Sequence, residues 1–244
     1  MEAKLKVLIV FAHAEPKSFC AAMKDKCVEV LTKNGHEVKV SDLYQMNHID
    51  PLGKTNFKKI VHPEYFKPKR EQSICNANNF EGYEDSVKAE HEKFNWASHL
   101  LFIFPLYWFH FPGIMKNWID KTLSMGFAYG TKKGNYCMNK LAMLIYATGE
   151  TKQMLDTEFR FMYHIMIDQT FGFCSIESLE PFPAFAVAHI SQDERKKILD
   201  DLGLAMENIT KRPIYKSMDK EISHENYAKG PEEIKVYREK KEKK

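Results

Sequence analysis

An apolar run in the middle of the chain, residues 100–104 (LLFIF), limits most strongly the folds that this sequence can adopt. Five consecutive apolar residues without alternation are typical of a parallel strand that is buried on both faces. Pro105 ends the run, because proline has no N–H group to donate to a neighbouring strand. Pro112 marks the start of a helix, where its missing N–H costs nothing. The buried face of that helix is predicted at Ile114, Met115, Trp118, Ile119 and Leu123.

The loop between these two prolines is unusually aromatic. Residues 106–111 read LYWFHF, where a polar loop is expected. Taken singly, each of these rings is more often a core residue than a ligand contact. Ligands of open parallel sheets bind at the carboxyl ends of the strands, which is where this loop lies. The group as a whole therefore fits a flat aromatic ligand better than a packed core.

The remaining periodic segments alternate between strands and helices. Further strands are predicted at 6–12, 37–42, 141–147 and 175–179, and further helices at 19–33, 85–97 and 191–210. Residues 47–84 are expected to be irregular. A strand–helix–strand unit at the start of the chain predicts a doubly wound α/β fold with five parallel strands.

The turn after the first strand lacks the G-x-G-x-x-G pattern of dinucleotide-binding Rossmann domains. Ser18 is a good N-cap, so N–H groups around residues 17–20 lie at a helix start, where an anion is favoured. The residues alone do not decide between a phosphate site and an ordinary turn.

Bulk properties exclude several classes of protein. The net charge of +3 gives no basic face for nucleic acid, and no apolar run is long enough to cross a membrane. Residues 7–12 are too short for a signal peptide, so a cytoplasmic protein is predicted. No metal site is predicted, because the histidines show no zinc spacing. Reduced thiols are expected at Cys20, Cys27, Cys75, Cys137 and Cys174, which form no C-x-x-C pair.

Three blocks of the sequence resemble the NAD(P)H:quinone oxidoreductase (DT-diaphorase-like) family of flavoproteins. The first is F-P-L-x-W-F-x-x-P-x-x-x-K-x-W from Phe104, followed by G-F-A-Y at 126–129. The second comprises 10–22 (VFAHAEPKSFCAA) and 41–47 (SDLYQMN), and the third is 179–195. Together the blocks span residues 5 to about 210, in the order that the family has.

This resemblance implies a flavodoxin-like fold over 1–210, with strand order 2-1-3-4-5. Residues 211–244 are rich in Lys and Glu and end in REKKEKK, which predicts a charged, solvated tail. It implies a two-electron reduction of quinones or related acceptors by NAD(P)H as co-substrate, in a ping-pong scheme. FAD is expected rather than FMN, because the 47–84 segment is similar to one that lies beside the dinucleotide half of FAD in the family. A cytoplasmic homodimer is implied.

The resemblance also assigns site residues. It assigns His13, Ser18, Phe19 and Cys20 to the phosphate-binding turn, and Pro105, Leu106, Tyr107, Trp108 and Phe109 to the loop under the isoalloxazine. It assigns Ala147, Thr148 and Gly149 to the pyrimidine edge, and Val187 and Arg195 to late flavin contacts. The substrate pocket is assigned to Trp108, Phe109, Tyr129, Phe173 and His189, with Tyr129 and Phe173 contributed by the partner chain.

The chain departs from the family pattern at several of these positions. Cys20 replaces an asparagine and Tyr107 a glutamine, and Glu150 stands where the family has a second glycine. Leu155 falls at the position of a tyrosine proposed to assist hydride transfer. Tyr163 and His164 follow nearby at helical spacing, which predicts packing or surface roles for both.

Two other functions are compatible with the sequence. An electron carrier of the flavodoxin type is usually strongly acidic, whereas this chain is mildly basic. A regulatory flavoprotein subunit of a membrane transport system is the second alternative, because soluble relatives act in that way. Co-purification with a membrane partner separates that reading from a free-standing enzyme.

Overall fold

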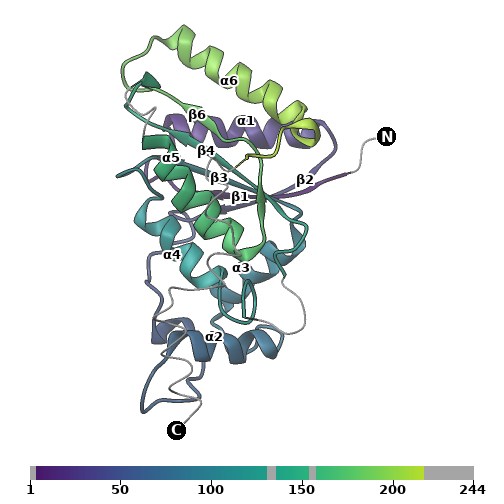
Figure 1. The fold of residues 1–244 in the computed structure, drawn as a ribbon, viewed down its shortest axis with the longest axis vertical. Helices are drawn as coiled ribbons and strands as arrows, with labels where there is room; N and C mark the ends of the chain where they lie inside the picture. Colours follow the sequence, from purple (N-terminus) through teal and green to yellow (C-terminus); the bar gives the residue numbers. More distant parts are fainter. Residues whose placement is uncertain (1–3, 131–135, 154–157, 217–244) are drawn as a thin grey trace, which may run out of the picture.

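A parallel sheet runs through the molecule in strand order β2-β1-β3-β4-β5, as predicted, with helices on both faces (Figure 1). The computed structural model describes residues 4–130, 136–153 and 158–216. The strands are β1 (Lys6–Phe11), β2 (Glu37–Asp42), β3 (His99–Pro105), β4 (Leu141–Ala147), β5 (Glu177–Ser178) and β6 (Phe182–Ala184). Every residue of β3 before Pro105 is buried, as its uninterrupted apolar sequence indicates.

The last strand differs from the prediction of one strand over 175–179. Two short strands, β5 and β6, both pair with β4 in its place, so the sheet has six strands. Ser175 has a φ of +62° and cannot lie in a strand. Pro181 separates the two strands, because it has no N–H to donate to β4.

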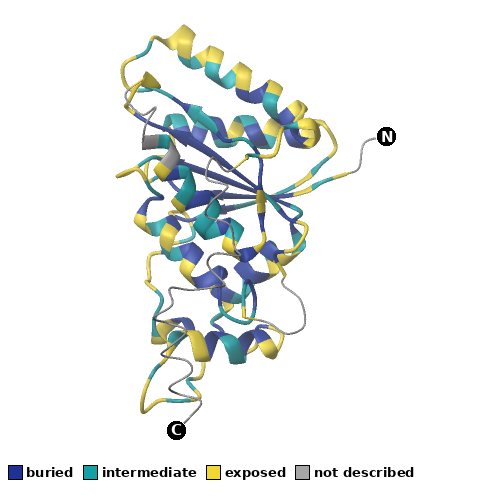
Figure 2. Cartoon of the chain, in the orientation of Figure 1, coloured by how far each residue is buried: buried dark blue, intermediate teal, exposed yellow. Residues whose placement is uncertain are grey.

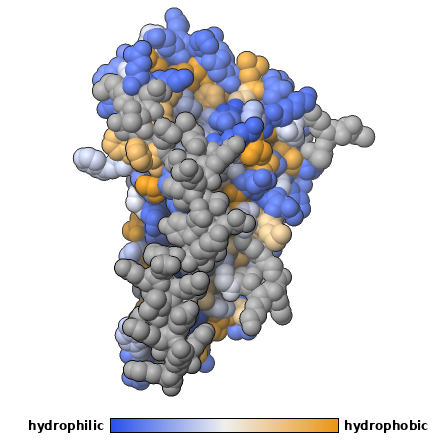
Figure 3. All heavy atoms as spheres, in the orientation of Figure 1, coloured by the Kyte–Doolittle hydropathy of each residue, from blue (hydrophilic) through white to orange (hydrophobic). Residues whose placement is uncertain are grey.

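The helices divide into two layers around the sheet. Helices α1 (Phe19–Lys33) and α6 (Gln192–Glu207) cover one face, and α3 (Asp85–Trp96), α4 (Gly113–Thr122) and α5 (Glu158–Tyr163) cover the other (Figure 1). A π-helical segment, η3 (His164–Phe171), continues from α5. The sheet between them is buried (Figure 2). The outer surface of α6 is mostly hydrophilic (Figure 3).

The prediction that residues 47–84 are irregular is wrong in part. A short 3₁₀ turn, η1 (Lys54–Asn56), and a helix, α2 (Pro68–Ala77), form within this segment. Helix α2 lies beyond α3 and α4 (Figure 1) and is fastened by polar groups. The Asn76 amide donates to Ser124 Oγ (2.9 Å) and to the Met125 carbonyl (2.8 Å). Because its buried residues include Glu71 and Gln72, α2 has no apolar stripe that marks it in the sequence.

Residues 211–216, which were predicted to begin the tail, pack on the edge of the sheet. Ile214 forms an antiparallel bridge with Leu179, and the Tyr215 N–H donates to the Ser178 carbonyl at 2.7 Å. The Arg212 guanidinium donates to the Glu180 and Pro181 carbonyls. The rest of the predicted tail lies outside the described residues. Among the helices that are described, none has the length and apolar content needed to cross a membrane.

Candidate functional site

The four segments assigned to cofactor binding meet at the carboxyl edge of the sheet. Parallel register places Phe11 of β1 beside Ile103 of β3, and Pro105 beside Ala147 of β4. Backbone hydrogen bonds continue past the strand ends, since the Leu106 N–H donates to the Ala147 carbonyl at 2.8 Å. The loops after β1, β3 and β4 are therefore held against one another.

The turn after β1 presents free amide groups at the start of α1. The Ser18 side chain caps the helix by accepting from the Ala21 N–H at 3.1 Å. Among the described residues, the Phe19 N–H has no acceptor, and the Cys20 N–H contacts only its own thiol. Because the helix dipole adds to these donors, the turn suits a phosphate group.

Cys20 connects this turn to β4. Its buried thiol makes a hydrogen bond with the backbone of Ala147, and burial raises the pKa of the thiol to about 12. A thiol with so high a pKa is neutral and unreactive at physiological pH. We therefore assign Cys20 a positioning role between the two loops, in the place of the family's asparagine.

The loop after β3 ends in a tight aromatic turn. Trp108 and Phe109 have φ values of +50° and +58°, and the Tyr107 and His110 backbones bond to each other in both directions. Two consecutive residues at positive φ make a type I′ turn, which normally takes asparagine and glycine. The turn holds the Trp108 side chain in solvent, 94% exposed, and leaves Tyr107 and Phe109 about half exposed. Phe111, the last ring of the loop, is instead buried in the core.

The loop after β4 pairs with the segment that follows β6. The Thr148 N–H donates to the Ala184 carbonyl (2.9 Å), and the Val187 N–H donates back to the Thr148 carbonyl (3.1 Å). The Ala186 N–H donates to the Glu150 carbonyl at 3.0 Å, so Glu150 takes part through its backbone.

Arg195 of α6 fastens this paired loop. Its Nε–H donates to the Val187 carbonyl at 3.0 Å. The same residue was assigned to FAD by resemblance, and the structure adds an internal contact to that assignment. Removing the guanidinium therefore affects the loop beside Thr148 as well as any direct contact with a ligand.

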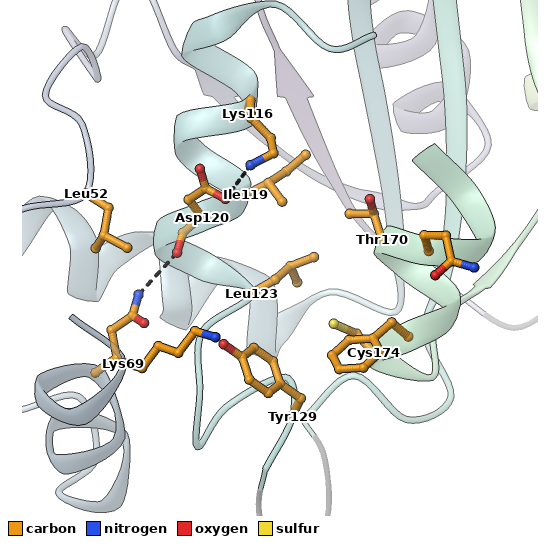
Figure 4. A pocket seen from close by; sticks show the side chains of 12 residues that line it. Leu52, Lys69, Lys116, Ile119, Asp120, Leu123, Tyr129, Thr170 and Cys174 are labelled. Carbon is orange, nitrogen blue, oxygen red and sulfur yellow. Dashed lines mark hydrogen bonds and ion pairs between the residues drawn. The ribbon is translucent and has the colours of Figure 1, made fainter. Parts of the chain in front are cut away.

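Tyr129 and Phe173 lie together in a separate place. Their ring centroids are 5.6 Å apart, and both residues line a pocket of about 380 Å³ on the flank of α4 (Figure 4). Lys116 and Asp120 face the same pocket and are joined by an ion pair. Trp108, Phe109 and His189 do not line it. One chain thus divides the predicted substrate residues between two surfaces, and the assignment of Tyr129 and Phe173 to a partner's site stays a prediction.

Tyr163 packs in the core, in the way that its helical spacing predicted. Its hydroxyl lies 2.7 Å from the Tyr146 hydroxyl, and burial raises its pKa to about 12. The His164 ring lies at the start of η3, with Nδ1 3.3 Å from the Asp168 carboxylate. Leu155 lies outside the described residues.

The sequence alone did not identify two further parts of the site. Glu15 folds the phosphate-binding turn with its side chain, and Ala184 and Ala186 supply the backbone that pairs with the loop after β4. The Glu-Pro-Lys-Ser sequence before α1 is a usable signal for the first, because an acidic residue next to a helix start tends to bond its free amides. The backbone pairing of Ala184 and Ala186 has no side-chain signal.

The chain is similar to known proteins of one flavodoxin-like family. Residues 5–208 match a family described by its flavodoxin-like fold. A ribosyldihydronicotinamide dehydrogenase [quinone] from rat (Rattus norvegicus) is 36% identical over 204 residues, which cover 80% of this chain and 87% of that protein. An NAD(P)H dehydrogenase [quinone] 1 from guinea pig (Cavia porcellus) is 33% identical over 232 residues, which cover 88% and 81% respectively.

A solved structure shows the same arrangement. A protein from Klebsiella pneumoniae, titled as a candidate quinone reductase, superposes with a TM-score of 0.79 at 26% identity. The superposition covers 86% of this chain and 87% of that one.

Proposed function

Because the chain belongs to the flavodoxin-like NAD(P)H:quinone oxidoreductase family, we propose that it reduces quinones by two electrons through a bound flavin. A bound flavin supplies the chemistry, since it accepts a hydride from a reduced nicotinamide and passes two electrons to an acceptor. The residues of the chain bind, orient and shield the reactants.

One observation carries this proposal: the aromatic turn at Trp108 and Phe109 stands exposed at the same edge of the sheet as the free amides of the β1–α1 turn. A flavin has a flat ring system and a phosphate on one ribityl arm, so it needs these two features together. The Phe19 and Cys20 amides fit the phosphate. The exposed rings of the turn fit the isoalloxazine.

The backbone of the loop after β4 offers a hydrogen-bond donor for the flavin ring. Thr148 and Gly149 follow β4 at the same edge. The Thr148 N–H is taken by the Ala184 carbonyl, so we assign the Gly149 N–H to the pyrimidine end of the ring, where negative charge develops on reduction. Val187 and Arg195 hold this loop in place from the other side. Preorganised donors of this kind stabilise charge without reorganising.

We propose that donor and acceptor use the same surface in turn, between the Trp108–Phe109 turn and the Tyr129–Phe173 pair of a second copy. We assign His189 to the edge of this surface, as the family resemblance suggests. The Tyr129 and Phe173 rings contact each other and both line the pocket on the flank of α4, so together they offer one apolar surface to a second copy. FAD is the cofactor that we propose, with FMN as the alternative. The five cysteines are buried thiols that form no disulfide, which suits the cytoplasm.

The purified protein is expected to be yellow, and this expectation tests the proposed function directly. The measurements are its visible absorption spectrum and the mass of the released cofactor. Quinone-dependent oxidation of NADH, NADPH and dihydronicotinamide riboside then identifies the donor, since the relatives' names differ on this point. A colourless protein that takes up neither FAD nor FMN contradicts the proposal.

Arg195→Ala is expected to raise the dissociation constants for both FAD and FMN by about tenfold or more, because a lost hydrogen bond from a charged group costs roughly 1.5–3 kcal/mol. The loss includes FMN because Arg195 holds Val187, which in turn holds Thr148. Fluorescence quenching gives both dissociation constants. Arg195→Lys is the matched variant, since it keeps the charge and lacks the Nε–H. A loss of affinity confined to FAD shows that Arg195 acts only on the adenylate half. Unchanged affinity for both flavins shows that Arg195 is an ordinary surface residue with no part in binding.

A further inference from the structure

The side chain of Glu15 occupies one donor of the proposed phosphate site. Its carboxylate Oε1 accepts from the Lys17 backbone N–H at 2.8 Å. The backbone of Glu15 makes two further contacts, since its N–H donates to His13 Nδ1 (2.9 Å) and its carbonyl accepts from the Ser18 N–H (3.1 Å). The carboxylate therefore lies in the same short turn as the free Phe19 amide.

No cation neutralises this carboxylate among the residues that the structure describes. Glu15 forms no ion pair there, and its carboxylate accepts only from the Lys17 backbone N–H. A bound phosphate therefore meets a negative charge and finds one amide of the turn already occupied. Both effects oppose binding, and both depend on how much charge the phosphate carries.

We propose that Glu15 selects FAD over FMN, an inference that rests on the proposed function. The phosphate of FMN is a monoester, which carries nearly two negative charges at neutral pH on three terminal oxygens. Each phosphate of the FAD pyrophosphate has one ester oxygen and one bridging anhydride oxygen, so it carries one charge on two terminal oxygens. FMN therefore concentrates its charge beside Glu15 and needs more donors than the turn offers, whereas FAD spreads its charge along the edge.

The test compares two variants that separate charge from occupancy. Glu15→Gln removes the charge and keeps a carbonyl oxygen for the Lys17 N–H, whereas Glu15→Ala also frees that N–H. The turn is expected to persist in both, since its other two bonds come from the backbone of residue 15. Glu207→Gln, an exposed residue at the end of α6, is the matched control.

Dissociation constants of flavin-free protein for FAD, FMN and riboflavin are the readout, by fluorescence quenching. FMN is expected to bind about threefold more tightly to Glu15→Gln and about tenfold more tightly to Glu15→Ala, from one screened charge and one freed hydrogen bond. The dissociation constant for FAD is expected to change by less than about half as much, and that for riboflavin, which has no phosphate, not at all. Added salt narrows the gap between FAD and FMN in the unmodified protein more than in Glu15→Gln, because salt screens exposed charges.

Equal changes for FAD and FMN, or equal changes for riboflavin, overturn the selectivity proposal while leaving the proposed function intact. Unmodified protein that binds neither FAD nor FMN overturns the proposed function itself, and this is seen before any variant is made. Unchanged dissociation constants in both Glu15 variants also overturn the inference.

Discussion

Trp108→Asn is expected to stabilise the flavin-free protein by about 1 kcal/mol and to weaken flavin binding about tenfold or more. Trp108 holds a φ of +50° although tryptophan disfavours the left-handed region, whereas asparagine is preferred at the first central position of a type I′ turn. The indole is 94% exposed, so its removal takes no packing from the core. Strain that no contact among the described residues offsets is typical of a functional site.

Denaturant unfolding and flavin titration measure the two effects on the same preparation. Phe161→Ala is the matched control, because it removes another ring, 70% exposed, from a residue without positive φ. That control is expected to change neither quantity appreciably. If Trp108→Asn instead loses about 3–5 kcal/mol of stability with flavin binding unchanged, Trp108 is a core residue and the binding assignment is wrong.

The central part of the fold follows from the sequence because its signals are redundant. The strands β1, β3 and β4 are short apolar runs typical of doubly buried strands, and Gly35 after α1 and Pro105 at the end of β3 mark where elements end. The carboxyl ends of parallel strands converge on one edge, so residues after each strand are predicted to be neighbours even though they are far apart in the chain.

The peripheral elements could not be predicted because tertiary contacts decide them. Helix α2 buries Glu71, whose carboxylate accepts from the Val61 and His62 N–H groups, so its buried face appears polar in the sequence. The division of the last strand depends on where Pro181 falls against β4, which only the register of the sheet defines.

Part of the site could be predicted, because the strand order places the ends of β1, β3 and β4 at one edge of the sheet. The positions of Ser18, Trp108 and Thr148 along the edge follow from the strand order. The left-handed turn at Trp108 does not, because local preference opposes it. The separation of Tyr129 from Trp108 within one chain also needed the coordinates, since spacing along a sequence says nothing about which surface a loop faces.

A second large effect is expected on lowering the pH, from two buried histidines. Burial lowers the pKa of His91 to about 4, and burial together with the nearby Lys121 lowers that of His48 to about 4. The ordinary value is about 6.5. His91 is satisfied only when neutral, since its Nδ1–H donates to the Val87 carbonyl and its Nε2 accepts from the Ser124 hydroxyl.

The sign follows from proton counting. Between pH 6.5 and pH 4 the unfolded chain holds protons on both histidines that the folded chain does not, so stability rises with pH in this window. The stabilisation is complete above pH 6.5 and is lost as the pH falls toward 4. Each histidine contributes about 3 kcal/mol over the whole window, with a limiting slope of about 1.4 kcal/mol per pH unit. Carboxylates such as Glu71, whose pKa is lowered, act below this window and add to the loss only near its lower end.

Denaturant unfolding at steps between pH 7 and pH 4.5 is expected to show a slope to which His91 and His48 contribute most, with further contributions from His99 and His110, whose pKa values burial also lowers. His91→Asn keeps an N–H that is able to donate to the Val87 carbonyl and no longer titrates, so it should lose a large part of the slope while starting from a lower stability at pH 7. His189→Gln changes an exposed ring and should leave the slope as it was. Equal slopes in all three proteins would show that His91 is protonated in the folded state, and that the polar cluster around Ser124 opens to admit the charge.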